Sequence, residues 1–150
     1  MPNWCYNRIT IYGDSETEAK LKEIEEIFEK ADPFNQIFPI PDFKNIPDEK
    51  GELPKLEQKL NPDGSVFYET YNFPDGTNDD RWYHWCIQNW GTKWDVSELD
   101  IEYADDEQLE LTFSTAWSPP EGIIERLRDK YPDLSFSCFY DEPGMEVAGY

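Results

Sequence analysis

The chain opens with alternating apolar and polar positions. In "CYNRITIYG" (5–13), Ile9 and Ile11 fall on one side of an extended backbone, and the polar residues around them fall on the other. An alternation of period two is typical of a strand with one buried and one open face. We therefore predict a first strand that is closed by Gly13.

The next segment, "DSETEAKLKEIEEIFEK" (14–30), changes to a helical period. Ser15 and Glu18 have the spacing of a capping box, which favours a helix start at this point. The apolar stripe that this helix should bury consists of Leu21, Ile24, Ile27 and Phe28.

A proline-rich stretch from residue 32 to residue 64 then breaks the periodicity and holds half of the 12 prolines. Its first part, "FNQIFPIP", is apolar, and we expect it to pack in an extended conformation. Residues 44–60 are polar and weakly patterned, so we predict a mobile loop. Both "NPDG" (61–64) and "FPDG" (73–76) suit type I turns, and "SVFYETYN" between them predicts a short strand.

The segment "NDDRWYHWCIQNWG" (78–91) predicts a second helix that is mostly buried, because aromatic residues widen its apolar face. Asn78 or Asp79 suits its N-cap, and Gly91 suits the left-handed position after its C-terminus. Trp90 continues the apolar side of the helix, so we expect its ring to lie in the core.

The adjoining "NWGTKWD" (89–95) places two tryptophans on either side of that glycine. The stretch is either a structural pin or an aromatic pocket that carries a cation. We expect Trp94 to cover the helix end or to line a surface groove. Lys93 can lay its stem on the neighbouring ring and keep its ammonium in water.

The C-terminal third combines three strands and a helix. Two alternating runs in residues 97–117 predict a hairpin around "ADDEQ". "SPPEGIIERLRDKYPDL" predicts a helix with Ser118 as N-cap and prolines in its first turn. Its apolar stripe consists of Ile123, Ile124, Leu127 and Tyr131. "LSFSCFY" (134–140) predicts a strand, and "MEVAGY" predicts a short final one.

This order of elements predicts an α+β fold of the ferredoxin-like type, with helices on one face of an antiparallel sheet. The chain should form a single domain over residues 1–150. An insertion over roughly residues 32–91, with a loop and an extra helix, separates the first helix from the second core strand.

The open face of the predicted sheet should be acidic and rich in hydroxyl groups. Its expected residues are Arg8, Thr10, Tyr12, Asp100, Glu102, Glu110, Thr112, Ser114, Ser135 and Ser137. An RNA-recognition module of this topology places aromatic and basic residues on that face. We therefore predict no direct nucleic-acid binding.

Composition narrows the class of partner. The 13 lysines and arginines against 33 acidic residues give a net charge of -20, which repels phosphate backbones and anionic lipids. The three cysteines form no C-x-x-C pair, which suits reduced thiols, and no apolar run is long enough to span a membrane. We expect a soluble cytoplasmic protein without membrane attachment; its oligomeric state is left open.

Five stretches carry a resemblance to a known family: "MPNWCYNRITIYG", "FNQIFPIP", "NWGTKWD", "FSTAWSPP" and "YDEPGMEVAGY". Together they resemble the YubB ferredoxin-like domain family of bacteriophages and conjugative plasmids, over nearly the whole chain. The resemblance implies the ferredoxin-like fold and a mobile-element origin, and it implies no activity.

Catalytic chemistry is sparsely represented, and we predict no catalytic residue, no metal site and no cofactor. His84 is the single histidine, and it has no second histidine to complete a metal motif. The carboxylates of "YADDEQ" lack the spacing of a calcium loop, so a solvated turn is the expected structure.

The polar and aromatic residues of the family-like motifs are the better candidates for binding a ligand or partner. They are Asn7, Lys93, Trp94, Asp95, Trp117 and Glu142, with Asn3 and Thr115 beside them. The end of the first strand, the exit of the hairpin and the "YDEPG" corner should converge in the predicted topology. The alternative is that the polar residues cap helices and form turns.

These patterns favour a non-catalytic, acidic interaction protein of a phage or plasmid, which modulates or inhibits a host or defence protein. The alternative is a module that binds a small anionic or nucleotide-like compound at the Trp94 and Lys93 region. A third possibility is a carboxylate-dependent enzyme, which would require a divalent metal.

Overall fold

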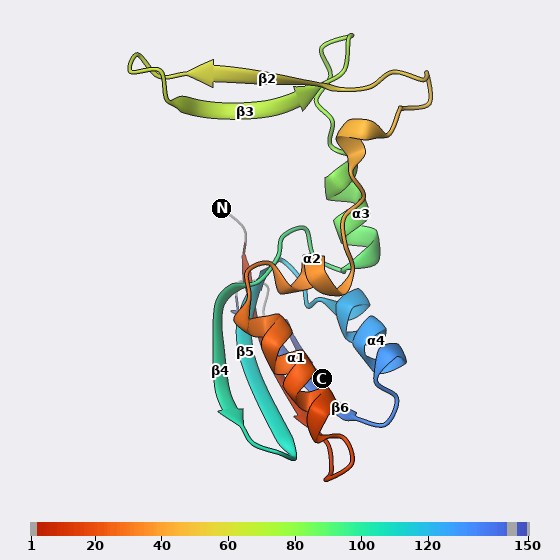
Figure 1. Cartoon of the computed structure of the whole chain (residues 1–150). Helices are drawn as coiled ribbons and strands as arrows, with labels where there is room; N and C mark the ends of the chain where they lie inside the picture. Colours follow the sequence, from red (N-terminus) through yellow and green to blue (C-terminus); the bar gives the residue numbers. More distant parts are fainter. Residues whose placement is uncertain (1–2, 144–146, 150) are drawn as a thin grey trace. The chain divides into compact units, whose positions relative to one another are not determined.

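A five-stranded antiparallel sheet forms the body of the first of two structural units (Figure 1). The structure is a computed structural model that describes residues 3–143 and 147–149. One unit comprises residues 1–39 and 86–150, and the other comprises residues 40–85.

The sheet of the first unit has the ferredoxin-like strand order. Its strands are β1 (Trp4–Tyr12), β4 (Ser97–Ala104), β5 (Gln108–Ala116), β6 (Ser135–Glu142) and β7 (Val147–Gly149). They lie in the order β4-β5-β1-β6-β7, and every neighbouring pair is antiparallel. The predicted fold class, the hairpin in 97–117 and the strand in 134–140 are therefore confirmed.

Helices α1 (Glu18–Glu29) and α4 (Glu121–Lys130) cover one face of this sheet, as Figure 1 shows. The core between them is formed by Ile9, Ile11, Leu109, Leu111 and Phe113 from the sheet and by Leu21, Ile24, Phe28, Ile123, Ile124 and Leu127 from the helices. Burial of each large side chain stabilises the fold by about 1.5–3 kcal/mol. Both predicted helical stripes face the core, with Ile27 half-buried.

Two predicted helix starts are wrong in detail. Before α1, Asp14 and Thr17 exchange the capping contacts expected of Ser15 and Glu18: the Asp14 N–H donates to Thr17 Oγ1, and the Thr17 N–H donates to Asp14 Oδ1. This pair lies one residue earlier than the predicted pair and closes a turn before the helix, and α1 begins after it at Glu18, with Thr17 at the N-cap position.

Ser118 does not cap α4, whose N-cap position is Pro120. The Ser118 hydroxyl instead donates to the backbone oxygen of Gly91. Pro119 disfavours a helical conformation at Ser118, and α4 begins only after Pro120. The Ser118 side chain is therefore free of the helix start and binds the segment at Gly91.

Part of the segment that was expected to be extended is helical. Residues Pro33–Ile37 form the short helix α2, with proline at its start, where the missing N–H costs least. Pro33 and Phe34 are buried. The Phe34 ring contacts Trp90 edge-on at a centroid distance of 5.8 Å.

Helix α3 (Arg81–Asn89) is mostly exposed, so the prediction of a mostly buried helix is wrong. Cys86 is its buried residue, whereas Trp82, Tyr83 and Ile87 are exposed. The predicted core position of Trp90 is confirmed, since its side chain is 2% exposed. Gly91 has a φ of 89°, the left-handed conformation that ends the helix as expected.

The second unit contains a two-stranded hairpin of β2 (Lys55–Leu60) and β3 (Val66–Asn72), preceded by the 3-10 turn η1 (Phe43–Asn45). The predicted turns are both present, because Gly64 and Gly76 donate to the backbone oxygens of Asn61 and Phe73. The strand β2 corrects the prediction of a loop across 44–60. Its polar sequence pairs along β3 without burying a face.

No helix within the described residues has the length and apolar character needed to cross a membrane.

Candidate functional site

The buried amide of Asn7 joins three segments at one end of the sheet. Its Nδ2 atom donates to Thr115 Oγ1 at 2.9 Å and to the backbone oxygen of Cys5 at 3.1 Å. The Thr115 hydroxyl donates to the backbone oxygen of Ser118 at 2.6 Å. Buried polar groups cost free energy unless they are paired, so these bonds fix the end of β1 against the exit of β5.

Glu142 comes from β6 and lies near this group. Burial raises the pKa of the Cys5 thiol to about 11, and the negative charge of Glu142 adds to the rise. The Glu142 side chain is buried, and its Oε1 has no hydrogen-bond partner within residues 3–143 and 147–149. The structure thus brings Asn7, Thr115 and Glu142 together around Cys5.

Trp117 follows β5 with a φ of 71°, which is uncommon for a residue with a bulky side chain. Its N–H donates to the backbone oxygen of Asn3 at 2.8 Å, and its side chain is exposed. The hydrogen bond ties the exit of β5 to the start of the first strand.

Lys93 and Trp94 form a separate surface group. The Lys93 Nζ atom lies 4.1 Å from the centre of the Trp94 ring, as the sequence predicts. The Trp94 side chain is 40% exposed and contacts the Trp4 ring at a centroid distance of 6.3 Å. Across the described residues, no hydrogen bond or ion pair joins this group to Asn7 or Glu142. Because Trp94 is not sealed in the core, anion binding at this place stays a prediction.

Asp95 caps a helix that is distant in sequence. Its Oδ1 and Oδ2 atoms accept hydrogen bonds from the N–H groups of Phe34 and Asn35, both at 3.0 Å, at the start of α2. Burial raises the pKa of Asp95, and the hydrogen bonds from these N–H groups lower it by a smaller amount. The local geometry therefore gives Asp95 a structural role, the alternative to ligand binding that its sequence motif also allowed.

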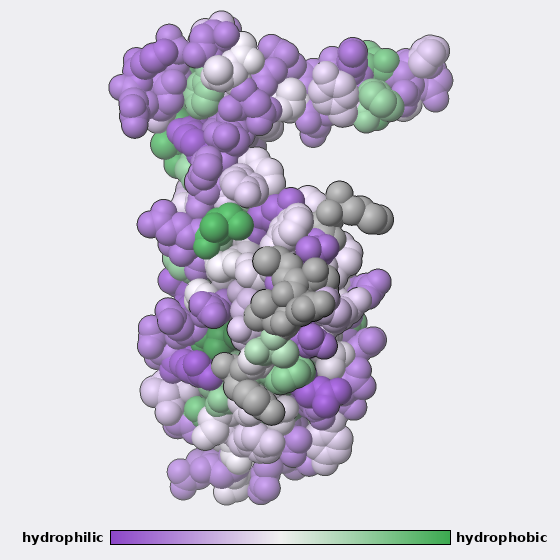
Figure 2. Space-filling model, turned by 180° about the vertical axis from the view of Figure 1, so that it is seen from behind, coloured by the Kyte–Doolittle hydropathy of each residue, from purple (hydrophilic) through white to green (hydrophobic). Residues whose placement is uncertain are grey.

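The inserted unit supplies a surface that the sequence did not reveal. More than half of the large hydrophobic side chains exposed in the described structure lie in residues 40–85. On the hairpin they are Leu56, Leu60, Val66, Phe67 and Tyr68, and Phe67 is 68% exposed. We name these five residues the hairpin patch. In Figure 2, green hydrophobic groups lie toward the tip of the hairpin, among purple hydrophilic ones.

The hairpin patch has no core beneath it. All six β2 side chains are exposed, and β3 becomes half-buried from Thr70 to Asn72. A two-stranded hairpin is marginally stable in water by itself, and exposed apolar patches in folded proteins mark interaction sites. The sequence carried a weak signal for this surface, since Leu56 and Leu60 fall on the same side of an extended backbone in the segment predicted as a loop.

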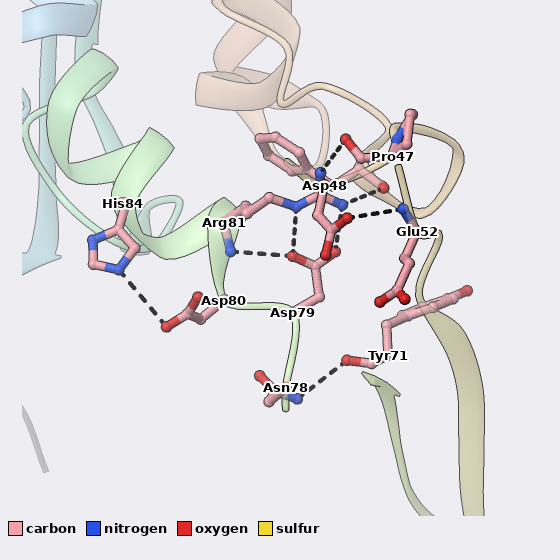
Figure 3. Close-up of polar contacts among 10 residues, drawn as sticks. Pro47, Asp48, Glu52, Tyr71, Asn78, Asp79, Asp80, Arg81 and His84 are labelled. Carbon is pink, nitrogen blue, oxygen red and sulfur yellow. Dashed lines mark hydrogen bonds and ion pairs between the residues drawn. The ribbon is translucent and has the colours of Figure 1, made fainter. Parts of the chain in front are cut away.

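Arg81 holds the base of the inserted unit together (Figure 3). Its guanidinium binds Asp79 through two contacts, Nε to Oδ1 at 2.8 Å and Nη2 to Oδ2 at 2.9 Å. Nη2 also donates to the backbone oxygen of Phe43 at 2.7 Å. The guanidinium lies over the rings of Phe43 and Phe73, at 5.0 and 5.3 Å from their centres.

The buried carboxylate of Asp79 is paired in this way, and its hydrogen bonds to Arg81 lower its pKa below the usual range. Charge-assisted, bidentate pairs of this kind are strong and fix geometry. We infer that the Arg81 contacts replace a hydrophobic core at the base of the hairpin. His84, in the same region, is exposed and lies 3.7 Å from Asp80.

The open face of the sheet differs from the predicted one in an important respect. It carries the exposed aromatic side chains of Tyr6 and Phe139 besides Tyr12, and the cavity beside the first two is also lined by Asp141. The signal was available, because the alternation of β1 continues back to Tyr6 and that of β6 continues forward to Phe139. Ser114 lies on this face as expected, because it pairs opposite Tyr6, but its side chain is buried.

Comparisons with known proteins agree with this fold. Residues 86–150 match the family model described as "Ferredoxin-like domain in Api92-like protein". The crystal structure of a protein Api92 from Yersinia pseudotuberculosis is similar with a TM-score of 0.53 and 12% identity. The alignment covers 100% of this chain and 93% of that chain. No curated protein matches the sequence.

At this level of identity the structural match concerns the fold. The family match covers the C-terminal strands β4 to β7 and helix α4, together with the end of α3. Residues Lys93, Trp94, Asp95, Trp117 and Glu142 lie inside the matched region, whereas the hairpin patch lies outside it.

Proposed function

We propose that the protein is a non-catalytic binding protein whose inserted hairpin contacts a basic protein partner. The observation that carries this proposal is the hairpin patch, a set of exposed apolar side chains on both strands of the hairpin, with Val66 and Tyr68 on one face and Phe67 on the other. Such surfaces are expensive to leave in water, so their occurrence favours a partner that covers them.

The charge of the chain favours a basic partner. A net charge of -20 attracts cationic proteins and raises their rate of association, whereas it opposes pairing of two copies of this chain. Asp63 and Asp75 lie in the turns at the two ends of β3, and hydrogen bonds from Ser65 and Thr77 lower their pKa. Lys50 lies 3.9 Å from Asp75, so Asp63 is the carboxylate of this pair that adds negative charge beside the apolar strands.

The biological setting that we propose follows from the sequence resemblance to the YubB family of phages and plasmids. A protein of a mobile element meets the proteins of its bacterial host. We therefore place the partner among host or defence proteins, which this protein would modulate or inhibit by occupying a functional surface.

Affinity capture from a bacterial lysate, followed by reconstitution, tests the proposal. Three proteins serve as baits in parallel. They are the wild type, the double variant Leu60→Ser/Phe67→Ser, and a matched control, Tyr12→Ser/Tyr103→Ser. The control removes two exposed aromatic rings from the sheet of the first unit. Each captured protein is then purified and its affinity measured by calorimetry at two salt concentrations.

We expect to capture a basic protein that binds the wild type and the control with equal affinity. It should bind the hairpin variant at least about tenfold more weakly, since each buried apolar side chain contributes about 1.5–3 kcal/mol. The affinity should fall as salt rises. Recovery of no partner, together with a tightly held small molecule in the purified protein, would overturn it.

A further inference from the structure

A cavity of about 410 Å³ opens on the face of the sheet that the helices leave uncovered. Its lining includes Tyr6, Arg8, Glu98, Ser114, Phe139 and Asp141. All of these belong to the first unit, and no residue of the hairpin patch lines this cavity. Its volume falls within the range of small-ligand sites in proteins.

The strand register explains how these residues come together. Tyr6 of β1 lies opposite Ser114 of β5 on one side and opposite Asp141 of β6 on the other. Arg8, two residues along β1, lies opposite Phe139. Residues two apart on a strand share a face, so the aromatic rings and the carboxylate project from the same surface.

The aromatic rings give the cavity a surface that attracts cations. The side chains of Tyr6 and Phe139 are 50% and 39% exposed. The face of an aromatic ring carries partial negative charge and attracts an ammonium or guanidinium group, most strongly when the cation is partly desolvated. A planar guanidinium can also stack on the ring.

The charged groups around the rings have a negative balance. Glu98 and Asp141 both line the cavity. Arg8, the one cation of the lining, forms a surface ion pair with Glu110 at 3.3 Å, which offsets part of its charge. Glu102 accepts a hydrogen bond from Thr112 at the same face. The carboxylates that line the cavity are thus left to attract a cation.

We propose that this cavity binds the guanidinium group of an arginine side chain presented by another protein. The carboxylates at Glu98 and Asp141 accept its N–H groups, and Tyr6 and Phe139 supply the ring faces. A single-stranded RNA would also find aromatic rings here, but its phosphates would meet carboxylates. This inference goes beyond the proposed function and stands whether or not the hairpin patch binds a partner.

The test is a ¹H–¹⁵N NMR titration of the whole chain with N-acetyl-arginine methylamide. Parallel titrations use the lysine analogue, the uncharged norleucine analogue and a uridine hexanucleotide. We expect the amide signals of Tyr6, Ser114 and Phe139 to shift with the arginine compound. The dissociation constant should be on the order of millimolar, because each exposed contact contributes about 1 kcal/mol or less.

Substitutions distinguish the contributions of the aromatic ring, the lining carboxylate and the overall negative charge to arginine binding. Phe139→Leu keeps an apolar side chain but removes the ring, and Asp141→Asn removes the charge in the same shape. Each should weaken binding about two- to fivefold. The matched controls are Tyr12→Leu, which removes an exposed ring outside the cavity, and Asp106→Asn, which removes an exposed charge from the hairpin turn. Both controls should bind as the wild type does.

Four outcomes would overturn the proposal. In the titrations, these are amide signals that do not shift with the arginine compound, signals that shift equally with the norleucine analogue, and signals that shift with the oligonucleotide in place of arginine. Among the variants, it is a weakening of arginine binding by Asp106→Asn that equals the weakening by Asp141→Asn. Stronger binding of the lysine analogue would contradict the preference for guanidinium. Variant spectra that keep the wild-type dispersion show that the fold is intact.

Discussion

Polar residues of the family-like motifs have structural roles, because their side chains form hydrogen bonds with backbone and side-chain groups of other segments. Asp95 caps α2 from 60 residues away, and Asn7 joins β1 to β5. The sequence identified these residues as special, because polar groups beside aromatic ones need partners when they are buried. It could not identify the partners, which come from distant segments. Lys93 on Trp94 was predictable, because the two are neighbours in the chain.

Trp90 offers the first prediction at this scale. Its ring is buried against Phe34, and its indole N–H donates to the backbone oxygen of Phe38 at 2.8 Å. Trp90→Ala should lower the free energy of unfolding by about 3–5 kcal/mol. Urea denaturation followed by circular dichroism measures this change.

The matched control for that experiment is Trp94→Ala, since this ring is exposed. Trp94→Ala should cost less than about 1.5 kcal/mol, as expected for one exposed aromatic contact. A wild-type denaturation midpoint for Trp90→Ala would show that the ring does not pin the helix end.

At the scale of elements, hydrophobic periodicity predicted the parts of the chain that pack on a core. The strands β1 and β5 and the helices α1 and α4 bury most apolar positions of their sequences, and β4 and β6 half-bury Leu99, Ile101, Phe136 and Cys138. Helix α3 was predicted as a helix, but its burial was not predicted correctly, because it exposes most of its apolar residues. Strand β2 was not predicted, because it has no buried face. A rule that equates apolar with buried fails for a segment that presents apolar residues outward.

The contact between the end of α3 and the start of α4 gives an element-scale prediction. Gly122 donates to the backbone oxygen of Trp90 at 3.0 Å, and a Cβ at position 122 would lie 1.9 Å from the backbone oxygen of Asn89. Gly122→Ala should therefore destabilise the protein by about 1–3 kcal/mol or more, although alanine favours helices.

Thermal denaturation of Gly122→Ala measures this effect. Ala19→Gly, at an exposed position of α1, is the matched control that changes helix propensity alone, at a cost of about 1 kcal/mol. A melting temperature of Gly122→Ala at or above that of the wild type would contradict the close approach of the two helices.

The Asp79–Arg81 pair makes the inserted unit sensitive to acid. The folded-state pKa of Asp79 is lowered, so the pair's contribution is fully present above the unfolded pKa of about 3.9 and is lost as pH falls through the lower folded value. Amide signals of Phe43 and Phe73 should lose their native shifts below about pH 4.

Asp79→Asn is the control for the acid experiment, because it cannot titrate. Its spectra should already show a loosened inserted unit at neutral pH, with little further change on acidification. Native shifts of Phe43 and Phe73 that persist in Asp79→Asn would contradict the role given to the pair.

At the scale of the whole molecule, the two units differ in how they are stabilised. The first has a continuous apolar core, whereas in residues 40–85 the buried side chains are Pro54 and Asp79. The sequence predicted the first unit well, because burial imposes periodicity on its elements. The surface of the second could not be predicted from periodicity, since exposed side chains are under no such constraint.

Limited proteolysis tests this difference in stability. Residues 44–60 should be cut first, because local opening there exposes few buried groups. The fragments can be identified by mass spectrometry. Initial cleavage within 97–117 would contradict the hairpin of β4 and β5 as part of a stable core.

Photo-crosslinking from the hairpin patch tests the central claim most directly. A benzoylphenylalanine is placed at position 67 in one protein and at position 103, an exposed tyrosine of β4, in another. After irradiation in a bacterial lysate, we predict a specific adduct with one basic protein from position 67 and its absence from position 103. No adduct from position 67, or the same adducts from both positions, would contradict the claim that the inserted hairpin binds a partner.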